Sequence, residues 1–103
     1  MKYLMLICVD PAIVPDEPGE IDAWLSRVGD ARLIGNELRE PREAATVRVR
    51  KNERLVTDGP FAETKEFVAG FDVIDCGSRE EALEIAALHP VAKFGAVEVR
   101  AFA

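Results

Sequence analysis

Seven consecutive apolar residues near the N-terminus, Tyr3–Val9, constrain the fold more than any other feature of this chain. The run YLMLICV shows no alternation of polar and apolar residues, which is typical of a strand buried on both faces. The 103 residues fit one domain, spanning 1–103. In a domain of that size, helices cover one face of a sheet. The run therefore predicts that a partner subunit covers the other face.

Two segments have the residue spacing of amphipathic helices. The second begins at Ser78, which forms a capping-box pair with Glu81. The first has Gly29 placed to end it, and its apolar residues recur at i, i+3, i+4 and i+7. These residues are Ile21, Trp24, Leu25 and Val28. The stretch 31–38 either continues that helix or is extended, and the proline-rich stretch 10–19 is predicted to be a loop.

Strand patterns account for most of the remaining chain. Thr46–Arg50 alternates polar and apolar residues, and Leu55–Thr57 returns after a charged turn, which predicts a hairpin. Phe67–Asp75 is predicted as a central strand, in which Gly70 indicates a bulge or a close approach of backbone or ligand. Ala96–Phe102 is the last strand.

The order of these elements is strand, helix, hairpin strands, strand, helix, strand. This order matches an α+β, ferredoxin-like βαββαβ plan with an extra hairpin and with both helices on one face of an antiparallel sheet. A two-fold dimer that stacks two sheets face to face would cover the bare face. We therefore expect a homodimer that forms a dimeric α+β barrel.

Composition and charge exclude several classes of partner and site. The formal net charge is −6 and the pI about 4.8, whereas nucleic-acid and anionic-membrane surfaces need a basic patch. Cys8 and Cys76 lie among apolar neighbours, which predicts buried free thiols in a cytoplasmic protein. One histidine and two scattered cysteines give no basis for a metal site, and we expect no cofactor. No apolar run approaches the roughly 18 residues of a membrane span.

The charged segment 56–71, between two predicted strands, is the candidate site. Asp58 in it is either a general acid/base, whose pKa desolvation would raise, or a turn residue that accepts backbone N–H bonds. Phe61 is either a plug that holds the turn on the core or an aromatic wall of a cleft. Lys65, beside Glu63 and Glu66, either orients an anionic group of a ligand or belongs to a solvated charge run.

Three other side chains are candidates outside this segment. Arg48 and Arg50 share one face of their strand, where they either bind a carboxylate of a ligand or line a polar sheet face. His89 is either a cation favoured by the C-terminal end of the second helix or a proton shuttle near the mouth of the barrel.

Six strings spread along nearly the whole chain resemble the YCII-related family, in its DGPF-domain branch. They are MKYLMLI, TVRVR, LVTDGPFAETKE, GFDVID, REEALEIAALHP and FGAVEVR. The resemblance implies a dimeric ferredoxin-like α+β barrel. Some relatives carry a His–Asp pair proposed as catalytic, and one resembles a dehydrochlorinase of chlorinated hydroquinones. This chain is shorter than usual between Pro11 and Leu38, and 20–29 contains no histidine, so a mechanism with a first-helix histidine does not transfer.

Three functions follow as hypotheses. The first is the binding of a small anionic or aromatic metabolite in a cleft beside Asp58–Glu66. The second is a cofactor-free isomerase or lyase that transfers a proton, with Asp58 as base and Lys65 or an arginine stabilising the developing anion. The third is an accessory or regulatory role with an extracytoplasmic-function sigma factor, an association that the family resemblance implies.

Overall fold

The apolar run near the N-terminus forms a central strand of a four-stranded antiparallel sheet. The computed structural model describes residues 1–13 and 21–103, so most of the predicted loop 10–19 lies outside the described residues. The strand order is β2-β5-β1-β6, and β1 pairs with both β5 and β6. The strands are β1 (Lys2–Val9), β2 (Arg32–Glu37), β5 (Phe67–Asp75) and β6 (Ala96–Ala101).

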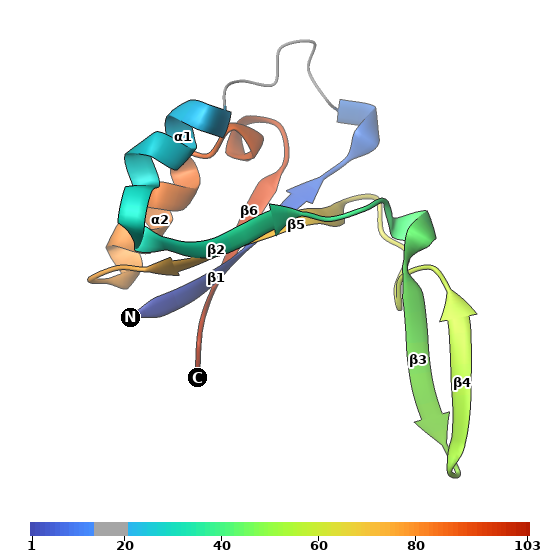
Figure 1. The fold of residues 1–103 in the computed structure, drawn as a ribbon. Coiled ribbons are helices and arrows are strands. Elements are labelled where there is room, and N and C mark those ends of the chain that lie inside the picture. The colour runs from blue at the N-terminus through green and yellow to red at the C-terminus, as the bar shows by residue number, and fades with distance from the viewer. Residues whose placement is uncertain (14–20) are drawn as a thin grey trace.

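Two helices, α1 (Ile21–Val28) and α2 (Arg79–Ala87), lie on one face of this sheet (Figure 1). Strand order and helix placement are those of a ferredoxin-like α+β fold, which confirms the predicted fold class. The core lies between the helices and the sheet, where Met5 and Ile74 have no exposed surface and Trp24 of α1 is buried. Within the described residues, no helix is long and apolar enough to cross a membrane.

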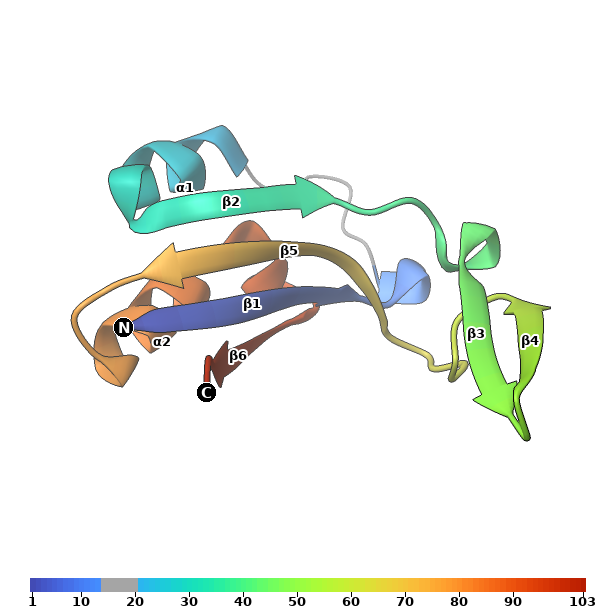
Figure 2. The ribbon, with the colours of Figure 1, turned by 60° about the horizontal axis from the view of Figure 1, so that its bottom comes forward.

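The two faces of β1 differ in burial. The helices leave the other face of the sheet bare (Figure 2). Tyr3, Met5 and Ile7 are buried under the helices, whereas Leu4 and Leu6, which point to the bare face, are only half-buried. Side chains alternate across a strand, so a continuous apolar run puts apolar groups on both faces. In the single chain the second face is open, and we call it the open face.

The ambiguous stretch 31–38 is mostly extended. Gly29 has φ +55°, a left-handed conformation that ends α1, and a short 3₁₀ turn leads into β2. The predicted hairpin is confirmed as β3 (Ala45–Arg50) and β4 (Glu53–Asp58), which pair with each other in a separate two-stranded sheet. Lys51 and Asn52 at its tip both have positive φ, as a tight hairpin turn requires.

Gly70 lies next to a bulge and also at a close approach of backbone, the two alternatives predicted for it. The pairing of β1 with β5 shifts between Ile7 and Cys8, next to Gly70, which marks a bulge. A Cβ on Gly70 would also lie 3.0 Å from the carbonyl oxygen of Asn36 on β2, so the neighbouring backbone approaches closely.

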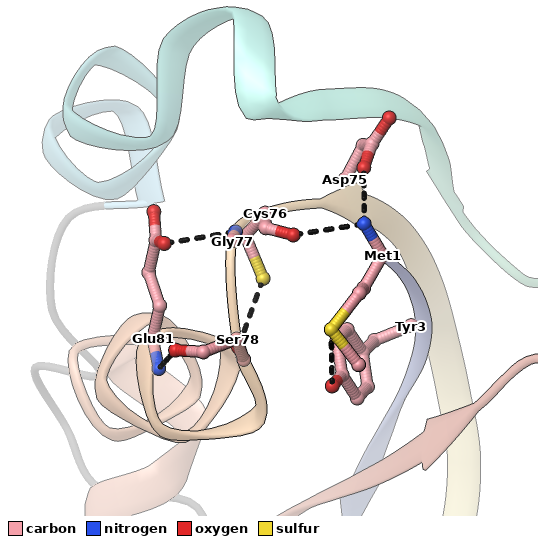
Figure 3. A network of polar contacts seen from close by, with 7 residues as sticks. All are labelled: Met1, Tyr3, Asp75, Cys76, Gly77, Ser78 and Glu81. Atoms are coloured by element: carbon pink, nitrogen blue, oxygen red, sulfur yellow. Dashed lines mark hydrogen bonds and ion pairs between the residues drawn. The ribbon is translucent and has the colours of Figure 1, made fainter.

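A polar network joins the start of α2 to the start of β1 (Figure 3). The Glu81 amide donates to Ser78 Oγ at 3.1 Å, which confirms the predicted cap. The Glu81 carboxylate accepts from the Gly77 amide at 2.9 Å, one residue earlier than in a standard capping box. The Met1 amine donates to Asp75 at 3.0 Å.

Both cysteines are free thiols, as predicted; Cys76 is buried and Cys8 is half-buried. The pKa of Cys8 is raised mainly by burial and, to a smaller extent, by the negative charges of Glu98 and Glu66.

Candidate functional site

A cavity of about 570 Å³ lies between the helix-covered face of the sheet, α1 and the turn that follows α2. That volume is in the range of sites for small molecules. Most of its lining is apolar and includes Ile7, Trp24, Leu25, Phe67, Val91 and Phe94. Its polar lining residues are Arg32, Asn36, Glu37, Glu40, Asp72 and His89. The cavity is therefore an apolar pocket with a few polar groups, which is the usual composition of a ligand site.

Asp72 and Arg32 form the strongest polar contact in this lining. Arg32 Nε lies 2.6 Å from Asp72 Oδ1, and the Asp72 side chain is 7% exposed. The two residues come from neighbouring strands, since β2 pairs with β5 and Arg32 is opposite Ile74. A charge-assisted hydrogen bond of this length holds both groups in fixed positions.

Gly35 makes room for this ion pair. It pairs with Asp72 across β2 and β5. A Cβ at position 35 would overlap the Asp72 carboxylate and would lie 2.5 Å from the Arg32 guanidinium and 2.8 Å from the Phe71 carbonyl oxygen. Glycine is thus needed there for space, since its φ is not in the left-handed region.

His89 is, besides Asp72, a buried titratable group in the cavity lining, and it is fixed by two contacts. Its Nδ1 accepts a hydrogen bond from the Val91 amide at 3.0 Å. Its ring packs edge-on against Trp24, with 4.7 Å between ring centroids. Trp24 in turn donates from Nε1 to the Ile85 carbonyl of α2 at 2.9 Å, so the ring pair links α1 to the end of α2.

These contacts define the protonation state of His89. Burial lowers its pKa, and the negative charge of Asp72 opposes that shift to a smaller extent. Because Nδ1 is an acceptor, the neutral ring carries its proton on Nε2. This arrangement is not that of a cation at a helix terminus, one of the two predictions for His89. A group that donates from Nε2 suits the other prediction, a role in proton transfer.

The site residues predicted in the charged segment 56–71 do not line the cavity. They are Asp58, Phe61, Glu63, Lys65 and Glu66. Asp58 is the exposed last residue of β4, and its carboxylate forms no hydrogen bond with the described part of the chain. The turn is closed by other groups: the Gly59 amide donates to the Ala44 carbonyl at 2.7 Å, and Gly59 has φ +94°. The backbone of Gly59 therefore shapes the turn.

Phe61 is 82% exposed in the single chain, so it neither plugs the core nor forms a wall of this cavity. The role of a plug that holds the turn on the core is therefore wrong within one subunit. The aromatic ring follows a tight turn at the base of the hairpin, where no part of the described chain covers it.

Lys65 pairs with a carboxylate of the chain itself. Its Nζ lies 3.6 Å from Oδ2 of Asp10, which is 4% exposed and follows the end of β1. The other Asp10 oxygen accepts from the Ala12 amide at 2.9 Å. Glu63 and Glu66 are exposed. Lys65 thus ties its segment to the end of the central strand.

Arg48 and Arg50 lie on the hairpin, outside the cavity lining. Both lie on the same face of β3, as predicted; Arg50 is exposed, and its guanidinium donates to the Val49 carbonyl at 3.0 Å. Of all the predicted site residues, only His89 lines the cavity.

Sequence reasoning missed Asp72 and Arg32. A signal for Asp72 existed: it lies at an inward position inside the mostly apolar strand FVAGFDVID, whose other charged residue, Asp75, is at the exposed end of the strand. Arg32 lies in the stretch 31–38, whose sequence is compatible with both helix and strand. Without that strand, its pairing with β5 could not be inferred.

The fold resembles that of a solved structure along its whole length. 5-Chloro-2-hydroxyhydroquinone dehydrochlorinase from Burkholderia phenoliruptrix, in complex with 2,5-dihydroxybenzoquinone, superimposes with a TM-score of 0.59. The match covers 100% of this chain and 94% of that one, at 16% sequence identity. At that identity the similarity concerns the fold.

Sequence similarity gives the family. An uncharacterised protein of Rhizobium meliloti (strain 1021) is 58% identical over 43 residues, which are 42% of this chain and 35% of that protein. The matched part thus spans about a third of this relative's length. The family model of the YCII-related domain matches residues 1–102. The chain therefore belongs to the YCII-related family.

Proposed function

We propose that this protein binds a small hydroxylated aromatic molecule in the cavity between α1, β2 and β5 and transfers a proton on it. The observation that carries the proposal is the buried Asp72, held by Arg32, in the lining of a mostly apolar cavity that also contains His89. Titratable groups buried in an apolar pocket are typical of acid/base sites.

The charges of the lining favour an uncharged ring over an anionic ligand. Arg32 is its one cation among the described residues, and its hydrogen bond is already directed at Asp72. Glu37 and Glu40 add two further carboxylates to the lining. A ligand carboxylate would be repelled there, whereas a phenolic hydroxyl can donate to Asp72. Of the two ligand classes expected from the sequence, the aromatic one fits better.

Asp72 and His89 supply complementary roles in proton transfer. The Asp72 carboxylate accepts a proton or a hydrogen bond from a ligand hydroxyl. The neutral His89 ring donates from Nε2 to an oxygen elsewhere on the ring of the ligand, since its Nδ1 is occupied by the Val91 amide. A donor and an acceptor at fixed positions are what an isomerisation or elimination on a hydroxylated ring requires. The dehydrochlorinase of similar fold acts on a hydroxylated ring, which agrees with this substrate class.

Thermal shift and turnover with a defined panel test the proposal. The panel contains hydroquinone, catechol, resorcinol and 5-chloro-2-hydroxyhydroquinone, with benzoate as the anionic member. A ligand at about 100 times its Kd contributes about 2.7 kcal/mol, which raises the Tm by roughly 10 °C for a chain of this size. We expect stabilisation by the uncharged rings and none by benzoate. Stabilisation by benzoate alone would contradict the proposed ligand class.

Asp72→Asn separates an enzyme from a binding protein. Asparagine keeps the shape and an acceptor for Arg32, and removes the base. An enzyme would lose turnover with its fold intact, while a protein that only binds would show no turnover before or after the change. The matched control is Asp58→Asn, which lies outside the cavity and should leave turnover unchanged.

We propose in addition that the protein is a homodimer held together through the open face. Strand register places Leu4 and Leu6 of β1 on that face, next to Val73 of β5 and Ile34 of β2. Ile34 is 59% exposed in the single chain. A contiguous apolar patch of this kind on a sheet face is a typical interaction surface. Sedimentation equilibrium tests it, and a monomer at micromolar concentration would contradict it.

A further inference from the structure

We propose that the hairpin β3–β4, residues 45–58, is an arm that clasps a second copy of this chain. The inference rests on the proposed homodimer and adds a second contact surface to it. It assigns a role to the part of the chain that the cavity does not use.

The arm is not part of the hydrophobic core of its own subunit. Among the described residues its strands pair only with each other, and every residue of β4 is exposed. None of the buried core residues lies between 45 and 58. A two-stranded hairpin alone is marginally stable in water at best, because it buries little apolar surface. Packing against another surface would stabilise the arm.

One face of the arm is mostly apolar, with Arg54 and Asp58 as its two charged residues, and we call it the valine face. Val47 is opposite Val56 in the ladder, and Val49 follows two residues after Val47 on the same side. These three side chains are 59%, 49% and 60% exposed, respectively. Three neighbouring exposed valines on a projecting element suit a protein contact better than solvent. Exposed Phe61 follows at the base of the arm.

Charge indicates which surface the arm meets. The arm contains four cations, Arg48, Arg50, Lys51 and Arg54, and two anions, Glu53 and Asp58. Its net charge is therefore +2, whereas the whole chain carries −6, so the remainder carries −8. Two arms would repel each other, while an arm and the body of another copy attract. The occupant that fits is the acidic body of a second subunit.

The position of the arm fits the same partner. Figure 1 shows the arm extending from the end of the sheet on the side away from α1 and α2, the side of the open face. Six residues per strand give the arm a reach of roughly 20 Å. The arm thus projects beside the open face, so a second copy bound to the open face would also contact the arm. The two strands of the arm are joined at its base, because Thr46 Oγ1 donates to the Gly59 carbonyl at 2.8 Å.

The triple variant Val47→Thr, Val49→Thr and Val56→Thr tests the inference. Threonine has nearly the shape of valine and a similar preference for strands, so the hairpin is retained while its valine face becomes polar. The matched control is Leu55→Thr, because Leu55 lies on the opposite face, paired with Arg48. Unfolding of each variant is followed by circular dichroism to verify the fold.

The dimer Kd is measured by sedimentation equilibrium for each protein. We expect the triple variant to raise the Kd by about tenfold or more, the control to leave it within about twofold, and salt to weaken the wild-type dimer. An unchanged Kd in the triple variant overturns the arm and leaves the homodimer standing. A monomeric wild-type protein overturns both the arm contact and the homodimer. Neither result bears on the proposed ligand site, which is tested separately.

Discussion

Arg32 Nε lies 2.6 Å from Asp72 Oδ1, and this ion pair connects the edge strand β2 to the interior strand β5 inside the cavity. The pair has two consequences. First, the hydrogen bond offsets part of the free energy that burial of the Asp72 carboxylate costs. Second, the position of that carboxylate depends on the pairing of β2 with β5, because its partner Arg32 lies 40 residues away in the sequence. Stability and site chemistry are therefore linked at this point.

Removing the arginine should destabilise the fold. Arg32→Met leaves the buried Asp72 carboxylate without its partner, and we expect a loss of roughly 2–3 kcal/mol in the free energy of unfolding. The double variant Arg32→Met with Asp72→Leu should recover part of that loss, because no charge is left buried. Urea denaturation at pH 7 measures both. Equal stability of Arg32→Met and wild type would show that Asp72 does not depend on this contact.

Adding one methyl group at position 35 should disrupt the same pair. In Gly35→Ala the new Cβ overlaps Asp72, so we expect a loss of about 1–3 kcal/mol together with weaker ligand binding. Gly77→Ala is the matched control, since its Cβ meets only the far end of the Glu81 side chain, at 3.1 Å and with no overlap. Chemical denaturation and ligand titration distinguish the two. Similar losses in both variants would contradict the steric explanation.

The single histidine of the chain permits a direct pH test. Burial lowers the pKa of His89 below its ordinary value of 6.5, so the folded state favours the neutral ring. The stability contribution is present in full above pH 6.5 and is lost as pH falls toward the folded pKa, because the unfolded chain then binds the proton more readily. Protonation of Nδ1 would also break the bond from the Val91 amide.

The NMR titration of the His89 ring should give a midpoint below 6.5, and His89→Gln should show a weaker fall of Tm between neutral and mildly acidic pH. Carboxylates elsewhere titrate in both proteins, so the difference between the two curves isolates His89. A midpoint above 6.5 would refute the neutral donor proposed for this ring.

The single tryptophan offers a readout of the cavity. Trp24 is 3% exposed and lines the cavity, so we expect blue-shifted emission that changes when a hydroxylated aromatic binds. Emission that stays constant while the Tm rises would place the ligand elsewhere.

Trp24→Phe removes the Nε1 bond to the Ile85 carbonyl. The loss should be about 1 kcal/mol from the hydrogen bond and somewhat more from the smaller ring. Thermal denaturation measures it, with Ile21→Val, on the same helix and partly exposed, as the control.

The sequence by itself determined the family and most of the fold. Local patterns suffice for these: the capping pair of Ser78 and Glu81, the spacing around Trp24 and the apolar run Tyr3–Val9 each depend on neighbours in the chain. The string DGPFAETKE, an identifying feature of the family resemblance, lies in the segment that closes the base of the hairpin.

Only the tertiary structure decided where the candidate site lies. The charged turn at 58–66, which the sequence indicates as the candidate site, is largely exposed. The cavity lies instead on the helix-covered side of the sheet. Arg32, Asp72 and His89 are brought together by the pairing of β2 with β5 and by the turn after α2. Which side chains share a cavity depends on strand register and on the face to which each residue points, and these are set by long-range pairing rather than by local sequence.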